Sequence, residues 1–288
     1  MTDVRRVLCA VDIDDAAEGV FADALWLCRR HHAALVVLHV VPAGRPFETG
    51  ATERVARLRH FRALAEAARV DVRVRVEHGD PGSIIASEAA DRGVDLIVLG
   101  TSGRGTDRRA SVVQAVLRLA DRPTLLVPFR DPSRALGFRR VVCAVDLASG
   151  SPAVVDAARM LAARDGSRIN LFHVTPGEDA DGADAGRRRL DETAGRALRR
   201  LQRQIPAPER DIVLANVATG EPASEISRAV RRLDAELLVF GVRPRPHSRP
   251  FRKTEALLDR ATCPLLAVPL VGGSSAGRTG GSRSRAAL

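Results

Sequence analysis

Apolar and polar positions follow two different rhythms along the chain. Short runs rich in valine, isoleucine and leucine are separated by longer segments in which apolar residues recur every three or four positions. This pattern is typical of strand and helix units around a parallel sheet. In the first half of the chain it predicts strands at about residues 6–11, 35–40, 70–76, 96–99 and 125–127, with helices in the intervals.

The third of these segments is the one with strict alternation. Valine occupies positions 70, 72, 74 and 76, and charged residues occupy the positions between them, whereas the other four segments are apolar on both faces. A strand with two apolar faces belongs inside a parallel sheet, and an alternating strand has one face in water. Residues 70–76 are therefore expected at an edge of the sheet.

Residues that favour helix starts stand where the expected helices begin. Aspartate and serine are good N-caps, and proline is tolerated in the first turn, where its missing N–H would have no partner. The expected caps are Asp14, Asp15, Ser149 and Ser151, and the expected first-turn prolines are Pro81 and Pro222.

The second half of the chain repeats the first. The offset between matching segments is 134 residues at the start of each copy and 141 from the third strand onward, so the second copy has gained seven residues. Self-similarity of this kind predicts two homologous domains. The matching pairs are VLCAVD at 7–12 with VVCAVD at 141–146, 39–42 with 173–176, 79–81 with 220–222, 95–100 with 236–241, and 123–128 with 264–269.

Length and composition agree with two domains. A chain of 288 residues with 45% hydrophobic and 28% charged residues can bury a core in each half. We assign residues 1–130 to the first domain and residues 139–271 to the second. Residues 272–288 form a Gly/Ser/Arg-rich tail that cannot build a core and is expected to be disordered.

The lengths of the apolar segments and the positions of the cysteines indicate the cellular compartment. None is long enough to span a bilayer, and we expect neither a signal peptide nor a membrane anchor. Cys9, Cys28, Cys143 and Cys263 form no C-x-x-C pair and lie within apolar segments, so we expect them to be small buried hydrophobes. A reducing cytoplasm fits this pattern.

The formal net charge of +10 raises the question of nucleic-acid binding. Residues 1–130 carry 19 arginines against 17 acidic residues, so we expect the surplus to lie in residues 243–253 and in the tail. The sequence has no tyrosine and 3% aromatic residues, which leaves few platforms for stacking bases. We expect a solvated loop and tail with no specific nucleic-acid partner; a polyanion site in residues 243–253 is the alternative.

Five motifs in each half resemble those of a universal stress protein domain. They are an aspartate after the first strand, His-Val in the second, G-x-P before the third helix, D-L-I-V-x-G at the fourth strand and P-x-L-x-V-P at the fifth, with substitutions in the second copy. The resemblance covers nearly the whole chain except the tail. It implies α/β domains of the flavodoxin-like (Rossmann-like) kind, each a five-stranded parallel sheet of order 3-2-1-4-5 with helices on both faces. It also implies pairing between fifth strands and, in one subclass, adenine-nucleotide binding.

The nucleotide-binding subclass carries G-x-x-G, nine further residues, and then G-S or G-T. Glycine lets the backbone approach phosphate, and the following helix presents free N–H groups to the anion. In the first copy residues 100–103 read Gly-Thr-Ser-Gly and match the opening. Six residues then precede Ala110 and Ser111, which stand where glycine and serine are expected. The loop is three residues short and lacks its last glycine.

The resemblance implies ATP or a related adenine nucleotide in the first copy. Asp12 would lie beside the adenine and ribose, Ser111 would cap the next helix and touch phosphate, and arginines at 104, 108 and 109 would supply charge. Alternatively, Asp12 only caps the turn into the first helix. The implied binding residues are Asp12, Val40, Gly100, Thr101, Gly103, Arg104, Ala110 and Ser111.

The corresponding loop of the second copy has the same length but poorer chemistry. Pro244 replaces the second glycine and removes an N–H donor, and Phe251 and Arg252 occupy the cap positions. We therefore expect Asp146 to cap the turn into its helix instead of binding a ligand, and the second site to be degenerate.

Two histidines, His39 and His173, fall within predicted strands. No second histidine, cysteine or carboxylate stands at ligand spacing from either, so we expect structural histidines and no metal site.

Two functions remain open for the two domains. The first is a stress-response signalling module that binds a nucleotide in the first domain. The second is a nucleotide-independent module that recognises an unknown protein, with both sites decayed. We expect no catalytic residues, because the acidic segment 12–16 would repel a pyrophosphate and no nucleophile with a base can be assembled. A homodimer is left open.

Overall fold

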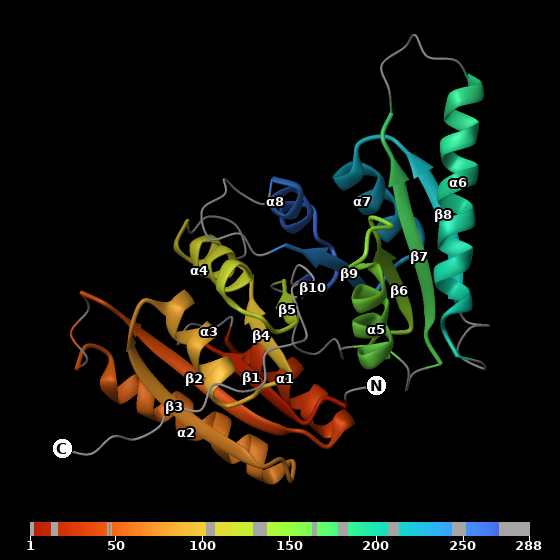
Figure 1. The fold of residues 1–288 in the computed structure, drawn as a ribbon. Helices are drawn as coiled ribbons and strands as arrows, with labels where there is room; N and C mark the ends of the chain where they lie inside the picture. The colour runs from red at the N-terminus through yellow and green to blue at the C-terminus, as the bar shows by residue number, and fades with distance from the viewer. Residues whose placement is uncertain are drawn as a thin grey trace, which may run out of the picture.

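The computed structural model of the chain describes residues 3–12, 17–44, 46, 48–101, 107–128, 137–162, 166–177, 184–206, 213–243 and 252–270. In the first half (Figure 1) its elements are β1 (Arg6–Ala10), α1 (Ala17–His31), β2 (Ala34–Pro42), α2 (Ala51–Ala67), β3 (Val72–Gly79), α3 (Pro81–Asp91), β4 (Leu96–Gly100), α4 (Asp107–Leu119) and β5 (Thr124–Val127). In the second half they are β6 (Arg140–Ala144), α5 (Ser151–Ala162), β7 (Arg168–Thr175), α6 (Asp184–Arg203), β8 (Val213–Thr219), α7 (Pro222–Arg232), β9 (Leu237–Val242), α8 (Arg252–Asp259) and β10 (Leu265–Pro269).

The described strands form one ten-stranded sheet of order β3-β2-β1-β4-β5-β10-β9-β6-β7-β8. Counted within its own copy, each half has the order 3-2-1-4-5, as the family resemblance implied. Strands within a half are parallel; Val7 of β1, for example, pairs with Leu35 of β2 and Leu96 of β4. The predicted fold class, two tandem Rossmann-like α/β domains, is confirmed.

The two halves join through their fifth strands. β5 and β10 run antiparallel, with Leu126 opposite Leu265 and Leu125 opposite Leu266, and all four side chains are buried. Each strand would be an apolar edge if its half stood alone, and an exposed edge of this kind invites aggregation. The predicted pairing of fifth strands is confirmed.

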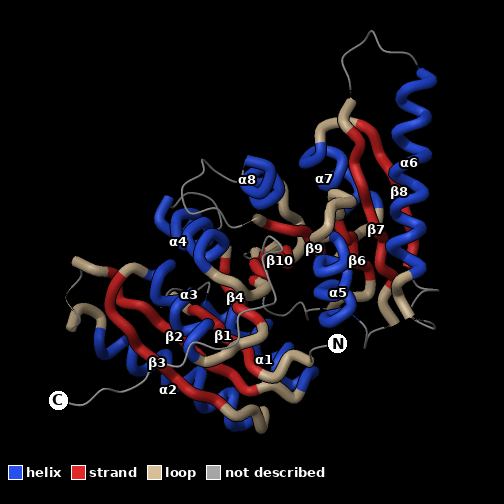
Figure 2. The backbone as a smooth tube through the Cα atoms, viewed as in Figure 1, coloured by secondary structure: helices blue, strands red, loops and turns tan. Residues whose placement is uncertain are grey.

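Helices cover both faces of the sheet, and blue helices alternate with red strands along the tube in Figure 2. One core lies between the sheet and α1, α2, α5 and α6, and the other lies between the sheet and α3, α4, α7 and α8. Each core contains residues of both halves, so the packing continues across the seam of β5 and β10. Within the described ranges, each helix is too short or too polar to cross a bilayer.

The alternating strand lies at an outer edge of the sheet, as predicted. β3 has one neighbour, β2, and its side chains alternate between exposed and partly buried. It begins at Val72 and not at Val70, because Arg69 takes a left-handed backbone conformation (φ 59°) and the N–H of Val70 bonds back to the carbonyl of Ala65 at the end of α2.

Helix starts follow the sequence in two places and depart from it in one. Pro81 and Pro222 lie in the first turns of α3 and α7, and Asp80 and Glu221 are the N-caps of these helices. In contrast, α5 begins at Ser151 itself, so this residue is not the cap that the sequence predicted. Asp14 and Asp15 lie outside the described residues.

The cysteines are buried, as predicted. Burial raises the pKa of the Cys28 and Cys263 thiols to about 12, so both stay protonated and unreactive at neutral pH.

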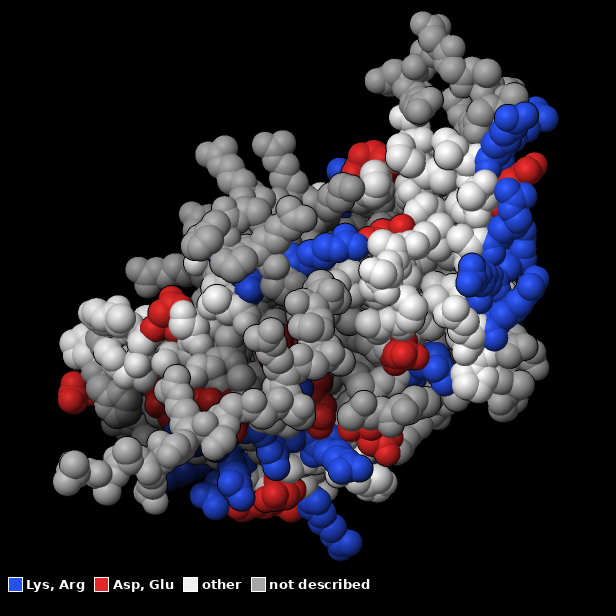
Figure 3. Space-filling view, in the orientation of Figure 1, with Lys and Arg blue, Asp and Glu red and all other residues white. Residues whose placement is uncertain are grey.

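Positive charge is distributed differently from the prediction. Figure 3 shows lysine and arginine side chains gathered along α6, at the right-hand edge of the view. The α6 sequence holds seven arginines against three acidic residues, a net +4. The expectation that the surplus lies in residues 243–253 and the tail alone is therefore wrong; most of that loop and the whole tail lie outside the described residues.

Candidate functional site

The carboxyl ends of β1 and β4 lie side by side, since Ala10 pairs with Leu99 near the end of both strands. The helices that follow these strands pack on opposite faces of the sheet, α1 on one and α4 on the other. Open α/β sheets bind ligands at such a switch point, beyond the carboxyl ends of the strands. The same arrangement recurs in the second copy, where Ala144 of β6 pairs with Phe240 of β9.

Four of the predicted binding residues lie in or just beyond β1, β2 and β4, the neighbouring strands around the first switch point. Asp12 is exposed, two residues beyond the end of β1, while Val40 is buried in β2. Gly100 is the last residue of β4 and Thr101 follows it. The N–H of Thr101 donates to the carbonyl of Val127 at 2.8 Å, so it is already used by the fold.

Gly100 has a packing role independent of any ligand. A Cβ atom at this position would lie 2.8 Å from Cγ2 of Val20 in α1, which is too close for a real contact. The glycine therefore lets α1 pack tightly on β4, and its presence in the motif does not by itself indicate phosphate binding.

The helix after this loop begins earlier than the sequence suggested. α4 starts at Asp107, so Ser111 lies exposed in its second turn, and the prediction that Ser111 caps the helix is wrong. Aspartate is itself favoured at helix starts, which accounts for the extra turn. Ala110 lies in α4, whereas Gly103 and Arg104 lie outside the described residues.

In the second copy the equivalent aspartate is held by the protein itself. Oδ1 of Asp146 accepts hydrogen bonds from the N–H of Ala148 at 3.0 Å and from the hydroxyl of Ser151 at 3.3 Å. Oδ2 accepts from Nη2 of Arg243 at 2.8 Å. Partial burial alone would raise the pKa of Asp146, but these hydrogen bonds and the positive charge lower it overall. The prediction that Asp146 caps the turn is confirmed.

Sequence reasoning missed the ion pair between Arg243 and Asp146. Arg243 directly follows β9, and β9 pairs with β6, the strand that leads to Asp146. At the matching position of the first copy stands Ser102. An arginine directly after the strand that neighbours β6 was the available signal in the sequence.

A second side chain, Leu270, also fills this end of the second copy. Cβ atoms built on Gly241 and Gly150 would lie 2.6 and 2.8 Å from Cδ1 of Leu270. Gly241 corresponds to Gly100 of the first copy by the offset of 141. The backbone that would approach a phosphate in a nucleotide site is therefore covered by a leucine of the same chain.

The two strand histidines fix the strand ends that carry the aspartates. Nδ1 of His39 lies 2.9 Å from the carbonyl oxygen of Val11, and Nδ1 of His173 lies 2.8 Å from that of Val145. These carbonyls belong to the residues just before Asp12 and Asp146. The prediction of structural histidines is confirmed. Among the described residues, no three His, Cys, Asp or Glu side chains are grouped to hold a metal ion.

Comparisons with known proteins match the chain twice. The model of the universal stress protein family matches residues 3–128 and again residues 137–269. A search of curated proteins gave no match.

Solved structures match the fold over nearly the whole chain. A universal stress protein from Archaeoglobus fulgidus DSM 4304 is 18% identical, with a TM-score of 0.69, covering 93% of this chain and 99% of that chain. A functionally unknown protein from Pseudomonas aeruginosa PAO1 is 17% identical, with a TM-score of 0.68 and 92% of both chains covered. The universal stress protein from Archaeoglobus fulgidus in complex with dAMP is 22% identical over 43% of this chain and 98% of that chain, with a TM-score of 0.37.

The family model covers each copy in turn, and each copy has the strand order and paired fifth strand described above. The chain therefore belongs to the universal stress protein family, in its tandem two-domain form.

Proposed function

We propose that this protein is a stress-response binding and signalling module in which the first domain holds ATP or a related adenine nucleotide and the second domain holds none. The observation that carries the proposal is the occupied edge of the second domain. Arg243 donates a hydrogen bond to one carboxylate oxygen of Asp146, and the side chain of Leu270 covers Gly241. A ribose hydroxyl or a phosphate would have to displace both.

The first domain supports binding through the corresponding features. Asp12 is exposed beyond the end of β1, and the sequence has Ser102 where the second copy has Arg243. α4 begins at Asp107, whereas α8 begins at Arg252, which matches position 111 by the offset of 141. A helix N-terminus favours anions, and in the first domain α4 follows β4. We assign the nucleotide to Asp12, Val40, Gly100, Thr101, Gly103, Arg104, Ala110 and Ser111.

The remaining features of the proposal are a cytoplasmic location, domain limits at 1–130 and 139–271, and binding without catalysis. Among the described residues at the second edge, Asp146 and Arg243 pair with each other. Such a pair lacks the nucleophile and general base that covalent or hydrolytic chemistry needs.

The second candidate is a nucleotide-independent module that recognises a protein partner or a second copy of the chain. Two observations in the first domain favour it. The N–H of Thr101 is used by Val127, and Gly100 is explained by the packing of Val20. The fold alone then accounts for Gly100 and for the N–H of Thr101, without a bound ligand.

Mass spectrometry of small molecules released from freshly purified protein decides between the two. We expect one adenine nucleotide per chain, and calorimetry should show that Asp12→Asn weakens its binding about tenfold, since a hydrogen bond to a charged group is worth roughly 1.5–3 kcal/mol. Asp146→Asn is the matched control and should leave the affinity unchanged. Two nucleotides per chain, or equal losses from both variants, would contradict the asymmetry; no nucleotide and no measurable binding would favour the second candidate.

A further inference from the structure

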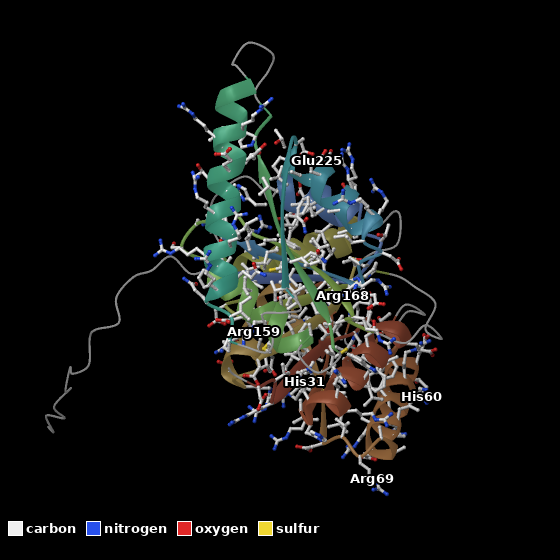
Figure 4. All side chains as sticks on the ribbon, turned by 90° about the vertical axis from the view of Figure 1, so that its right-hand side faces the viewer. His31, His60, Arg69, Arg159, Arg168 and Glu225 are labelled. Carbon is white, nitrogen blue, oxygen red and sulfur yellow. The ribbon has the colours of Figure 1, made fainter. Side chains whose placement is uncertain are left out.

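The outer face of α6 carries a row of arginines. Ala194, Leu198 and Leu201 point inward and are buried against the sheet, whereas Arg196 and Arg200 are exposed. In Figure 4, where α6 faces the viewer, long nitrogen-tipped side chains extend from this helix into solvent.

The row runs along the helix axis. With 3.6 residues per turn, Arg189, Arg196, Arg200 and Arg203 fall within about 60° of one another and on the side opposite Leu198. At 1.5 Å per residue the row is about 21 Å long. A row of this length fits an extended polyanion better than a single small anion. We call these four residues the α6 arginine row.

Of the acidic residues of α6, Glu192 is exposed one turn from Arg189 and Arg196 and offsets part of the charge of the row, whereas Asp191 faces away from it. Asp191 accepts hydrogen bonds from the hydroxyls of Thr175 at 2.8 Å and Thr219 at 3.2 Å, and so it faces β7 and β8. Arg196 donates to the hydroxyl of Thr193. Within the described part of the chain, the α6 arginine row forms no ion pair with a carboxylate.

The matching helix of the first copy shows a different surface. In α2, Arg62 pairs with Glu66 at 2.9 Å and Arg57 pairs with Glu18 of α1 at 3.4 Å. Its sequence has four arginines against two glutamates, compared with seven against three in α6. An arginine-rich composition alone would have affected both helices, so it does not account for the unpaired row.

We propose that the α6 arginine row binds the phosphate backbone of double-stranded nucleic acid without sequence preference. A duplex carries one negative charge per about 1.7 Å of axis, so a straight row of guanidinium groups can contact several phosphates at once. α6 contains no aromatic residue that could stack on unpaired bases. This proposal is independent of the nucleotide site in the first domain.

A membrane surface fits the helix less well. Interfacial helices insert an apolar face that includes large hydrophobic residues, and the apolar face of α6 is already buried on the sheet. Leu190, which is 50% exposed, is the one large apolar side chain of α6 that is exposed among those described.

The test is the binding of a fluorescent duplex of mixed sequence to the full chain over a range of salt concentrations. Replacing Arg196, Arg200 and Arg203 with glutamine keeps a good helix former at exposed positions. We expect binding to weaken at least about tenfold at low salt. The slope of log K against log salt should fall in magnitude by about 3, since each lost phosphate contact removes about 0.9. Circular dichroism should show an unchanged fold.

The control variant removes the same charge from the other domain. Arg57, Arg59 and Arg62 of α2, replaced with glutamine, should leave duplex binding unchanged, and so should truncation after Val271. Equal loss in the α2 and α6 variants would overturn the proposal, as would binding that vanishes with the tail alone. It would also be overturned if vesicles with phosphatidylserine or poly-glutamate bound the chain more tightly than the duplex, or if no duplex binding were seen at low salt.

Discussion

Asp12 and Asp146 occupy the same position in two copies of one fold, and in each copy the carbonyl of the residue just before the aspartate lies within hydrogen-bond distance of a histidine ring. Asp146 is bonded to Arg243 from the neighbouring strand, and Leu270 packs over the adjacent glycine. The two copies share the scaffold of the switch point, and under the proposed function Arg243 and Leu270 occupy the place that a ligand would take in the second copy.

The comparison shows that the first glycine of the motif has a packing role in both copies. Gly241 matches Gly100, yet each glycine is crowded by a neighbouring side chain, Leu270 in one copy and Val20 in the other. A glycine in this motif is therefore weak support for a nucleotide. The residues that differ between the copies are more informative, above all Ser102 and Arg243.

The largest expected effect concerns the first-domain loop. If the loop contacts phosphate through its backbone, Gly103→Val should block the approach of the nucleotide and weaken its binding by at least about 100-fold, or about 2.7 kcal/mol. Arg245→Ala, in the corresponding loop of the second copy, should leave the affinity as it is. Calorimetry with ATP measures both, and similar losses from the two changes would remove the proposed asymmetry.

A smaller effect is expected from adding a methyl group at Gly241, where Leu270 packs against the backbone. Gly241→Ala places a methyl group 2.6 Å from Cδ1 of Leu270 and 3.2 Å from Cγ2 of Val154, so these side chains must shift, and overpacking of this kind costs roughly 1–3 kcal/mol of unfolding free energy. Combining it with Leu270→Ala should recover part of that loss, because the methyl then meets an empty space. Urea unfolding of the two single variants and the double variant gives the coupling energy. Additive losses would show that Leu270 does not cover Gly241.

Much of the fold could be predicted from the sequence, because it rests on repeated local patterns. Apolar runs gave the strands, the alternation of residues 70–76 placed an edge strand, and the shared motifs implied the strand order and the pairing of β5 with β10. Each of these signals lies within one short segment or recurs at a fixed offset.

The side-chain detail of the site could be predicted less well, because it depends on contacts between distant segments. Arg243 lies 97 residues from Asp146, and Leu270 lies 120 positions from Gly150 (270 − 150). Ser111 was misplaced because Asp107, a second residue suited to a helix start, begins α4 one turn earlier. The net positive charge of α6 was missed because charges were counted over long segments, in which acidic residues elsewhere in the second half offset the arginines of α6.

The smallest expected effect is the contribution of the Arg243–Asp146 ion pair to stability, and its sign with pH follows from the lowered pKa of Asp146. The folded pKa lies below the ordinary value of 3.8, so the stabilisation is fully present above the unfolded pKa and is lost as pH falls through the folded pKa. The side chains of Arg243 and Asp146 are 50% and 47% exposed, so we expect less than about 1 kcal/mol. The unfolding free energies of the wild type and Asp146→Asn should differ by this constant amount between pH 5 and pH 7, and the difference should diminish as the pH falls below about 4.

The control is Arg243→Gln, which leaves the hydrogen bonds from Ala148 and Ser151 to Asp146 in place. Its unfolding free energy should differ less from that of the wild type, and the difference should shrink with added salt. A gap between wild type and Asp146→Asn that widens below pH 4 would mean that the charged form of Asp146 is destabilised in the folded protein, contrary to its contacts with Ala148 and Arg243.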